Sequence, residues 1–323
     1  MSMDSDVIVD RRRMRRKLTF WRVASVVIAI AAIGSVAVLL SPGSRGGFST
    51  NSSIARINIE GLIRSDRERV EALERLEKSK TAAAVIVHIN SPGGTTAGSE
   101  QLYESLVRLK AKKPLVVVVE GLAASGGYIT AIASDHIVAQ QSSLVGSIGV
   151  LFQFPNVSEL LKTVGVKVEE VKSSPLKAAP NGFEPTSPEA RDALDALVKD
   201  SFAWFKGLVK DRRGMDDAQI DKVADGRVFT GRQAVGLKLI DELGDEKTAL
   251  TWLTEQKGVK KDLPVRDYSL GPRFGDLTFL RTAASITLDA IGLGAIARQV
   301  ESSAMDRFAL DGMLALWQPA ATN

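Results

Sequence analysis

The chain has 323 residues, of which 45% are hydrophobic, enough for one large domain or two smaller ones. It contains no cysteine, which excludes disulfides, thiolate catalysis and cysteine-ligated metal sites. The net charge of +4 is carried entirely by residues 1–22, which hold seven basic and three acidic side chains, so the remainder is neutral. A nucleic-acid partner is therefore disfavoured, because such proteins spread basic charge over their folded part.

An apolar run follows this basic N-terminus, which we expect to be cytoplasmic. Residues 23–40 are 18 residues without a charge, about 27 Å of helix against a hydrocarbon core of ~30 Å. A cleaved signal peptide is the alternative, but its apolar region is shorter and ends in a small-x-small site. We expect an uncleaved anchor, with everything after Leu40 outside the cytoplasm by the positive-inside rule. The Gly- and Ser-rich residues 41–53 predict a flexible linker.

Strand and helix patterns alternate over residues 54–257, which we expect to form one domain. Strands are expected over 54–61, 82–90, 114–120, 135–140 and 166–172, and helices over 67–80, 96–112 and 188–213. This alternation predicts an α/β fold with a parallel sheet and right-handed crossovers. Residues 258–323 predict a helical or irregular extension. Its apolar "MLALWQP" could pack on a neighbour, lie on the membrane or belong to the core.

Two glycine-rich loops each follow a predicted buried strand and begin a helix: "INSPGG" (89–94) and "EGLAASGG" (120–127). Sites in parallel α/β sheets form beyond the carboxyl ends of strands. The free backbone N–H groups at the start of both helices suit an anion, or an oxyanion that forms during reaction. A purely structural use of these glycines remains open at this point.

Ser125 stands among the smallest side chains, in the stretch "AASGG". This is a relaxed form of the nucleophile elbow, a strained strand-to-helix turn that tolerates only small neighbours and exposes a hydroxyl. In that reading Gly127 lets the helix start close to the sheet. The alternative is that Ser125 is an ordinary helix N-cap. The local sequence does not separate the two.

A serine nucleophile needs a base. His88 and His136 both lie in predicted strands, with no acidic residue evidently placed to orient either of them. Lys177 follows a predicted strand and has apolar neighbours, so it should lose hydration, which favours the neutral amine that accepts a proton. Ser–Lys dyads are an attested variant of the triad. Lys177 could also be an ordinary surface lysine. Ser147, a hydroxyl between two glycines, could hydrogen-bond the lysine amine.

With these residues collected, the chain resembles bacterial signal peptide peptidases of the SppA type, short form, in the ClpP/crotonase-like superfamily. The resemblance covers roughly residues 54–257. It rests on five motifs in order: "INSPGG" (89–94), "ASGGY" (124–128), "GSIGV" (146–150), "KSSPLK" (172–177) and "GRVFTGRQAVGLKLIDELG" (226–244). One departure is Ser174, where the family often has glycine, which loosens the turn before Lys177.

The resemblance implies a ClpP/crotonase-like fold of repeated ββα units and a Ser–Lys hydrolase of peptide bonds. It implies Ser125 as nucleophile, Lys177 as general base and Ser147 as the group that orients the lysine. The implied oxyanion hole is formed by the backbone N–H groups of Gly94 and Gly126, with Gly93 close by. No metal or cofactor is expected, because the sequence has no HExxH motif and no Walker-type loop.

The resemblance also implies partners and a location. The substrates would be remnant signal peptides and other short apolar peptides, and the enzyme would be a homo-oligomer whose active sites can draw on adjacent protomers. The chain would sit in the bacterial inner membrane through residues 23–40, with a periplasmic catalytic domain. Three rival classes are a crotonase-type acyl-CoA enzyme, a non-catalytic anchored scaffold and a soluble ATP-dependent protease component. Export disfavours the first; the anchor and the missing triad histidine disfavour the third.

Overall fold

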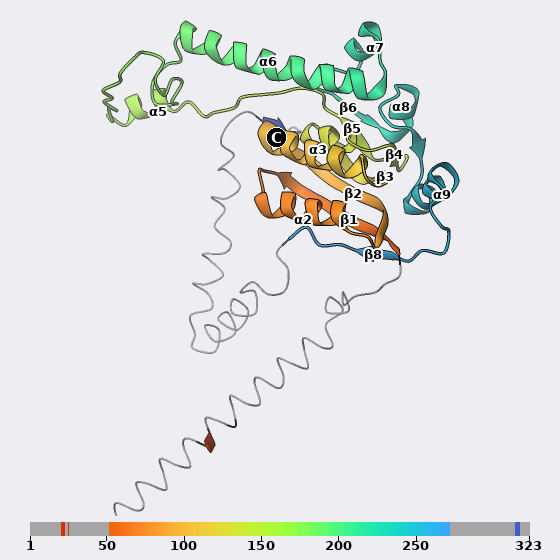
Figure 1. Ribbon diagram of the computed structural model, residues 1–323. Helices are drawn as coiled ribbons and strands as arrows, with labels where there is room; N and C mark the ends of the chain where they lie inside the picture. Colours follow the sequence, from red (N-terminus) through yellow and green to blue (C-terminus); the bar gives the residue numbers. More distant parts are fainter. Residues whose placement is uncertain (1–20, 23–24, 26–51, 272–313, 317–323) are drawn as a thin grey trace, which may run out of the picture. The chain divides into compact units, whose positions relative to one another are not determined.

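The computed structural model describes residues 21–22, 25, 52–271 and 314–316 (Figure 1). The anchor expected over residues 23–40 therefore lies, apart from Ser25, outside the described residues. Among the residues that are described, no helix combines the length and the apolar character needed to cross a membrane. The fold belongs to the second of two compact units, residues 52–323.

A mixed sheet forms the centre of this unit, with strand order β6-β5-β3-β2-β1-β8. Its strands are β1 (Ser53–Ile63), β2 (Ala82–Thr95), β3 (Leu115–Ala124), β4 (His136–Ala139), β5 (Leu144–Gly146), β6 (Val228–Thr230), β7 (Glu242–Leu243), β8 (Val265–Asp267) and β9 (Leu314–Leu316). Most pairs are parallel, as expected, but β5–β6 and β2–β9 are antiparallel. The expectation of a parallel sheet is therefore only partly right.

Helices cover both faces of the sheet, which explains why β2 and β3 are continuous apolar runs. The helices are α2 (Arg67–Lys78), α3 (Thr96–Lys110), α4 (Gly126–Ala131), α5 (Ser158–Thr163), α6 (Pro188–Arg213), α7 (Asp217–Asp221), α8 (Gly231–Gly236) and α9 (Glu246–Lys257). One face packs Val85, Val87 and Ile89 against α2, α3, α4 and the C-terminal half of α6. On the other face, Ile86 and Val118 pack against α9.

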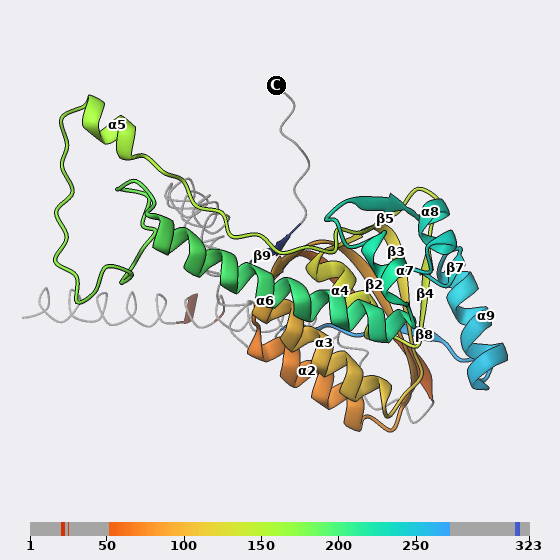
Figure 2. The same ribbon diagram turned by 90° about the horizontal axis from the view of Figure 1, so that it is seen from above.

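Two local expectations are wrong. The segment 166–172 alternates like a strand but pairs with no strand of the described residues, because it lies away from the sheet (Figure 2). The strand expected to end at Asn90 continues through Pro92 to Thr95, with a register irregularity where it passes β3. In addition, β8 pairs with β1, so residues of the expected C-terminal extension belong to the sheet.

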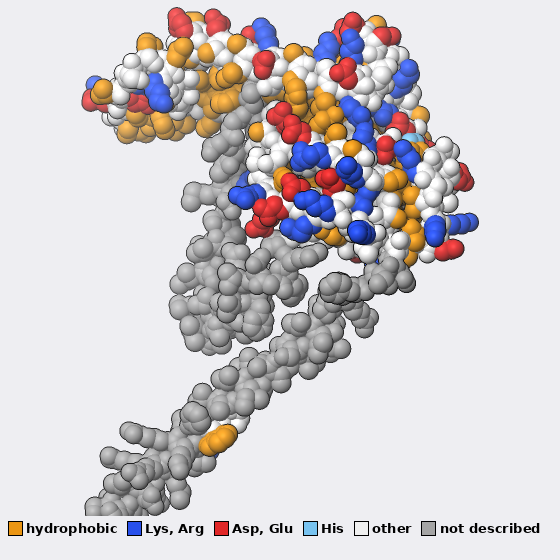
Figure 3. Space-filling model, viewed as in Figure 1, with side chains coloured by type: hydrophobic (Ala, Val, Ile, Leu, Met, Phe, Trp, Pro, Cys, Tyr) orange, Lys and Arg blue, Asp and Glu red, His pale blue; other side chains and the backbone are white. Residues whose placement is uncertain are grey.

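Residues 152–186, here called the arm, extend from β5 away from the sheet and return beside the N-terminal half of α6 (Figures 1 and 2). Figure 3 shows hydrophobic side chains gathered along its underside. The exposed large apolar side chains of the arm are Phe152, Leu160, Val164, Val166, Val168, Val171, Leu176 and Phe183. A lone protomer thus leaves an extended apolar surface in water, which is characteristic of an interaction site.

The far end of α6 is fastened to the body of the unit. Arg212 donates to the backbone oxygens of Ile132 and Ser134, both at 2.8 Å. Arg213 pairs with Asp241 at 2.8 Å. The helix starts at the N-cap Ser187, whose side chain accepts from the backbone of the first turn, as the sequence predicted.

Candidate active site

Ser125 occupies a strained turn between β3 and α4. Its φ of 53° and ψ of −115° are unusual for a residue with a side chain, and such a conformation costs on the order of 1–3 kcal/mol. The turn is held on both sides: the Ser125 N–H donates to Gly146 O at 2.7 Å, and its carbonyl accepts from Tyr128 and Ile129, both at 2.9 Å. This is the strand-to-helix elbow that the small residues predicted, but the hydroxyl that such an elbow was expected to expose is buried.

The hydroxyl of Ser125 does not cap the helix. Its side chain makes no capping bond to α4, so the N-cap alternative is excluded. The residue is 0% exposed, and Oγ has no hydrogen-bond partner within the described part of the chain. Native proteins leave few buried polar groups unpaired, because each costs about 1–3 kcal/mol. A strained backbone and an unpaired hydroxyl at one residue together point to a chemical role.

The two glycine loops meet at this turn. A Cβ on Gly127 would lie 2.6 Å from Ser91 O, so only glycine lets α4 start this close to β2. A Cβ on Gly94 would lie 1.8 Å from Ile63 O in β1. Gly93 has a φ of 100°, and its N–H donates to Ser91 Oγ at 3.0 Å. The glycines therefore bring β2 and the start of α4 into close contact beside Ser125.

Ser147 lies next to the same turn. Ala124, the last residue of β3, pairs with Gly146 in β5, and Ser147 directly follows Gly146. It is buried and has a φ of 52°, and its N–H donates to Arg227 O at 2.8 Å. The structure thus brings Ser125, Ser147 and the glycine loops together at the carboxyl ends of β2, β3 and β5, as parallel strand ends predict.

Lys177 is not part of this cluster within one protomer. It lies exposed on the arm, in a turn where its N–H donates to Ser174 O at 3.1 Å. The loss of hydration expected from its apolar neighbours is therefore not found in the chain by itself, because these neighbours are themselves exposed or half-buried. The next residue, Ala178, has a φ of 57°. Since Ser125 Oγ has no hydrogen-bond partner among the described residues, which include Lys177, the two side chains are not in contact in the chain by itself.

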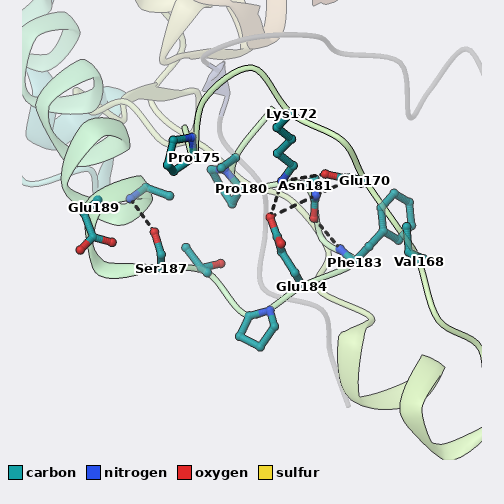
Figure 4. A pocket seen from close by; sticks show the side chains of 14 residues that line it. Val168, Glu170, Lys172, Pro175, Pro180, Asn181, Phe183, Glu184, Ser187 and Glu189 are labelled. Carbon is teal, nitrogen blue, oxygen red and sulfur yellow. Dashed lines mark hydrogen bonds and ion pairs between the residues drawn. The ribbon is translucent and has the colours of Figure 1, made fainter. Parts of the chain in front are cut away.

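An ion-pair cluster closes the loop that carries Lys177 (Figure 4). Lys172 Nζ contacts Glu170 at 2.7 Å and Glu184 at 2.6 Å, and Asn181 donates to Glu170 at 2.7 Å. These groups line an open pocket of about 430 Å³. The hydrogen bonds from Lys172 to Glu170 and Glu184 raise the pKa of Lys172, so this lysine stays protonated and is unsuited to act as a base. The sequence did not reveal this cluster, because its members are up to 14 residues apart.

Both histidines are engaged elsewhere, and both have carboxylate neighbours that the sequence did not reveal. His88 contacts Glu120 through Nδ1 at 2.8 Å and Glu246 through Nε2 at 2.6 Å. Its side chain points to the α9 face, because alternate residues of β2 face opposite sides. His136 stacks on Trp252 with ring centroids 4.7 Å apart. Neither ring contacts Ser125, which agrees with their expected role as satisfied strand residues.

Glu246 is the centre of the His88 cluster. Burial acts to raise the pKa of Glu246, but hydrogen bonds from Arg56 at 2.6 and 2.7 Å and from His88 outweigh it and hold the pKa below its ordinary value. The cluster ties β1, β2 and β3 to α9. Within the described residues, no group of three or more His, Asp or Glu side chains could hold a metal ion.

Comparison with known proteins gives the family. The model of peptidase family S49 matches residues 107–260, a span that contains Ser125, Ser147 and Lys177. A Synechocystis sp. protein whose name designates it a protease is 37% identical over 216 residues, which cover 66% of this chain and 78% of the relative. The chain belongs to peptidase family S49. This S49 peptidase is therefore a serine protease, a hydrolase.

Other relatives place the S49 peptidase with the SppA-type members. Protease 4 of Haemophilus influenzae is 30% identical over 69% of this chain, which spans 38% of that relative. A protein of Enterococcus faecium whose name includes signal peptide peptidase SppA is 29% identical over 65% of each chain.

The fold is ClpP-like, since the Clp protease family model matches residues 56–143. A solved ClpP1 mutant from Listeria monocytogenes aligns with a TM-score of 0.40 and 15% identity, over 59% of this chain and 91% of that one. A membrane-bound stomatin-specific protease mutant aligns with a TM-score of 0.43 and 14% identity, over 68% and 98%.

Proposed function

We propose that this S49 protease is a membrane-anchored endopeptidase that cleaves remnant signal peptides and other short apolar peptides with a Ser125–Lys177 dyad. The observation that carries the proposal is the Ser125 hydroxyl, which is buried and unpaired on a strained strand-to-helix turn. The substrate class and the anchor, residues 23–40 in the bacterial inner membrane with the catalytic domain outside the cytoplasm, rest on the sequence and on the family.

The proposed reaction starts with neutral Lys177, which takes the proton from Ser125 Oγ as the oxygen attacks the scissile carbonyl carbon. The oxyanion accepts hydrogen bonds from the backbone N–H groups of Gly94 and Gly126, with Gly93 close by. Lys177 then gives the proton to the leaving amine. Water, deprotonated by the same lysine, attacks the acyl-enzyme and breaks its ester bond, and the lysine returns the proton to Ser125 Oγ as the second product leaves. Ser147 holds the lysine amine in place.

We propose further that the dyad forms between two copies of the chain. Three observations support this: Ser125 Oγ has no partner among the described residues of its own chain, Lys177 is exposed, and the arm that carries Lys177 is lined with exposed apolar side chains. Packing of the arm on a second copy would bury these side chains and bring a lysine to each serine. In a closed ring, every subunit would then give one lysine and receive another.

The test is complementation between two inactive variants. Ser125→Ala and Lys177→Ala should each fold, assemble and lose cleavage of a signal-peptide library followed by mass spectrometry. Mixed in equal amounts and allowed to exchange subunits, they should regain about a quarter of wild-type activity, because random assortment in a ring pairs an intact serine with an intact lysine at that frequency. The control mixes Ser125→Ala with the Ser125→Ala/Lys177→Ala double variant. This mixture contains no intact serine and should stay inactive.

Two results would contradict the proposal separately. Full activity of Lys177→Ala would remove the lysine as base. Inactivity of the mixed oligomers, with subunit exchange demonstrated, would show that the dyad does not form between copies. A serine-directed active-site probe adds a further check: it should label the wild-type protein and not Ser125→Ala, and absence of labelling would favour a non-catalytic scaffold.

A further inference from the structure

Ser91 lies where the pairing of the sheet is interrupted on both sides of β2. On the β1 side, the pairing passes from Asn90 directly to Gly93, which leaves a bulge in β2. On the β3 side, β2 advances by two residues from Ile89 to Ser91 while β3 advances by four. Hydrogen bonds of the regular ladder are lost at such a bulge, and the buried main-chain groups there need other partners.

The side chain of Ser91 supplies these partners. Its Oγ donates to Gly61 O in β1 at 2.7 Å and accepts from the Gly93 N–H at 3.0 Å. A serine hydroxyl has one proton to donate and lone pairs that accept, and both functions are used here by a residue that is 0% exposed. Gly61 and Gly93 have φ values of 66° and 100°. The hydroxyl therefore joins two stretches of main chain that glycine forms most easily.

Ser91 also contacts the second glycine loop. It pairs with Ala123 in β3, two residues before the nucleophile. Its carbonyl oxygen lies 2.6 Å from the point where a Cβ on Gly127 would stand, so its main chain lies directly against the start of α4. One residue therefore connects the two loops whose N–H groups, those of Gly94 and Gly126, are proposed to hold the oxyanion.

From these contacts we infer that Ser91 is a positioning residue of the active site, which fixes the Gly94 N–H relative to the Gly126 N–H as the oxyanion requires. The inference deepens the proposed function and rests on it. Ser91 acts through Gly93, because its own hydroxyl is fully engaged. The N–H of Gly93 is engaged by Ser91 Oγ in turn, so the N–H groups left for the oxyanion are those of Gly94 and Gly126.

Loss of this positioning has a definite kinetic signature. Hydrogen bonds to an oxyanion act in the transition state and not on bound substrate, so weakening them lowers kcat and leaves KM nearly unchanged. Removing one such donor outright costs about 10²–10³ in kcat. In Ser91→Ala the donors remain but Gly93 is no longer held, so we expect a smaller fall, of at least about tenfold. A serine that only stabilised the fold would lower Tm and leave the kcat of the folded protein unchanged.

The first experiment measures cleavage of a short signal-peptide substrate by the full-length Ser91→Ala protein. Its kcat should fall at least about tenfold, with KM within about twofold of wild type. The matched control is Ser105→Ala in α3. Ser105 is 3% exposed, and its Oγ also makes one donated and one accepted bond, to Gln101 O at 2.8 Å and from Arg108 at 3.0 Å. This control should match wild type in both constants. An unchanged kcat in Ser91→Ala, or an equal fall in Ser105→Ala, would overturn the inference.

A second variant serves where Ser91→Ala does not fold. Ser91→Cys nearly keeps the shape of the side chain but replaces the hydroxyl with a weak donor and acceptor. Its kcat should fall at least about threefold at unchanged KM, because the bonds to Gly61 and Gly93 are weakened and not lost. A wild-type kcat in this variant would overturn the inference.

The second experiment probes the oxyanion without turnover. A peptide aldehyde adds to Ser125: Oγ bonds to the aldehyde carbon, the electron pair of the broken π bond moves to the aldehyde oxygen, and the serine proton passes to Lys177. The matching peptide alcohol binds but forms no oxyanion. Ser91→Ala should weaken inhibition by the aldehyde by about the factor lost in kcat and leave inhibition by the alcohol unchanged.

Two results separate this inference from the proposed function. Equal inhibition of wild type and Ser91→Ala by the aldehyde, with Ser125→Ala inactive, would overturn the inference alone. Full activity of Ser125→Ala would instead count against the proposed function, on which the inference rests.

Discussion

Replacing Ser125 should make the protein more stable while abolishing its activity. We expect Ser125→Ala to unfold at a higher temperature than wild type, and Ser125→Gly to have a stability close to that of the alanine variant. Most substitutions of buried residues destabilise a protein, so this prediction goes against the ordinary result. It follows from two costs that the structure assigns to Ser125: a buried hydroxyl without a partner and a φ of 53°.

The magnitude follows from these costs. In Ser125→Ala the penalty of about 1–3 kcal/mol for an unpaired buried hydroxyl is removed, but the packing contacts of one oxygen are lost. The net increase in the free energy of unfolding is therefore about 1 kcal/mol. Glycine also relieves a backbone strain of on the order of 1–3 kcal/mol, but it loses about 0.5–1 kcal/mol to chain entropy and ~0.8 kcal/mol to the missing carbon. These figures put the glycine variant between about 0.8 kcal/mol below and about 1.7 kcal/mol above alanine, with a midpoint of about 0.5 kcal/mol above it.

Thermal unfolding followed by circular dichroism measures the effect, at one protein concentration so that assembly does not bias the comparison. For a domain of this size, 1 kcal/mol moves Tm by about 2–4 °C. The control is Ser143→Ala, since Ser143 Oγ donates to Val119 O at 2.8 Å and to Glu120 O at 3.0 Å. This control should lower Tm by a similar amount. A lower Tm for both Ser125 variants would refute the view that this serine is held at a cost in stability.

Three further predictions concern the supports of the site. Gly127→Ala places a Cβ 2.6 Å from Ser91 O, so it should cost about 1–3 kcal/mol, displace α4 and lower peptidase activity; unchanged Tm and activity would contradict the close approach. Because the pKa of Glu246 is held below its ordinary value of 4.5, this carboxylate stabilises the fold above about pH 4.5, and the benefit is lost as pH falls through the lowered pKa. Glu246→Gln should therefore lower Tm at pH 7 and flatten its decline in acid, and an unaltered Tm profile would argue against the cluster. Lys172→Met should open the loop that carries Lys177 and lower kcat severalfold at unchanged Tm, whereas Lys172→Arg should retain most of the activity; equal activity of the two variants would show that the ion pairs do not position the loop.

Local sequence patterns explain most of the features that were predicted correctly. Helix α6 has the predicted bounds, Pro188–Arg213, because Ser187 caps its start and Gly214 ends it in a left-handed conformation. The elbow at Ser125 was recognisable because only small residues fit between β3 and α4. The meeting of the glycine loops with Ser147 followed from the rule that parallel strands end at one edge. The first two features are encoded by neighbouring residues, and the third follows from a general rule of parallel sheets.

The features that the sequence did not predict depend on contacts between residues far apart in the sequence. Residues 166–172 have a strand pattern, but a strand needs a neighbour, and the arm offers none among the described residues. Strands β5, β8 and β9 have three residues each, too few to show a period. The contact between His88 and Glu246 joins residues 158 apart. In the proposed dyad, Lys177 would reach Ser125 from a second copy of the chain, a contact that no local sequence pattern encodes.

Helix α6 connects the arm to the body of the domain. Its 26 residues make a rod about 39 Å long, fixed to the body of the domain at Arg212 and Arg213 and continuous with the arm at Ser187. A tilt of 10° at the fixed end would move the other end by about 7 Å over that length, more than the reach of a hydrogen bond. The orientation of the arm therefore depends on the contacts of two arginines at the opposite end of the helix.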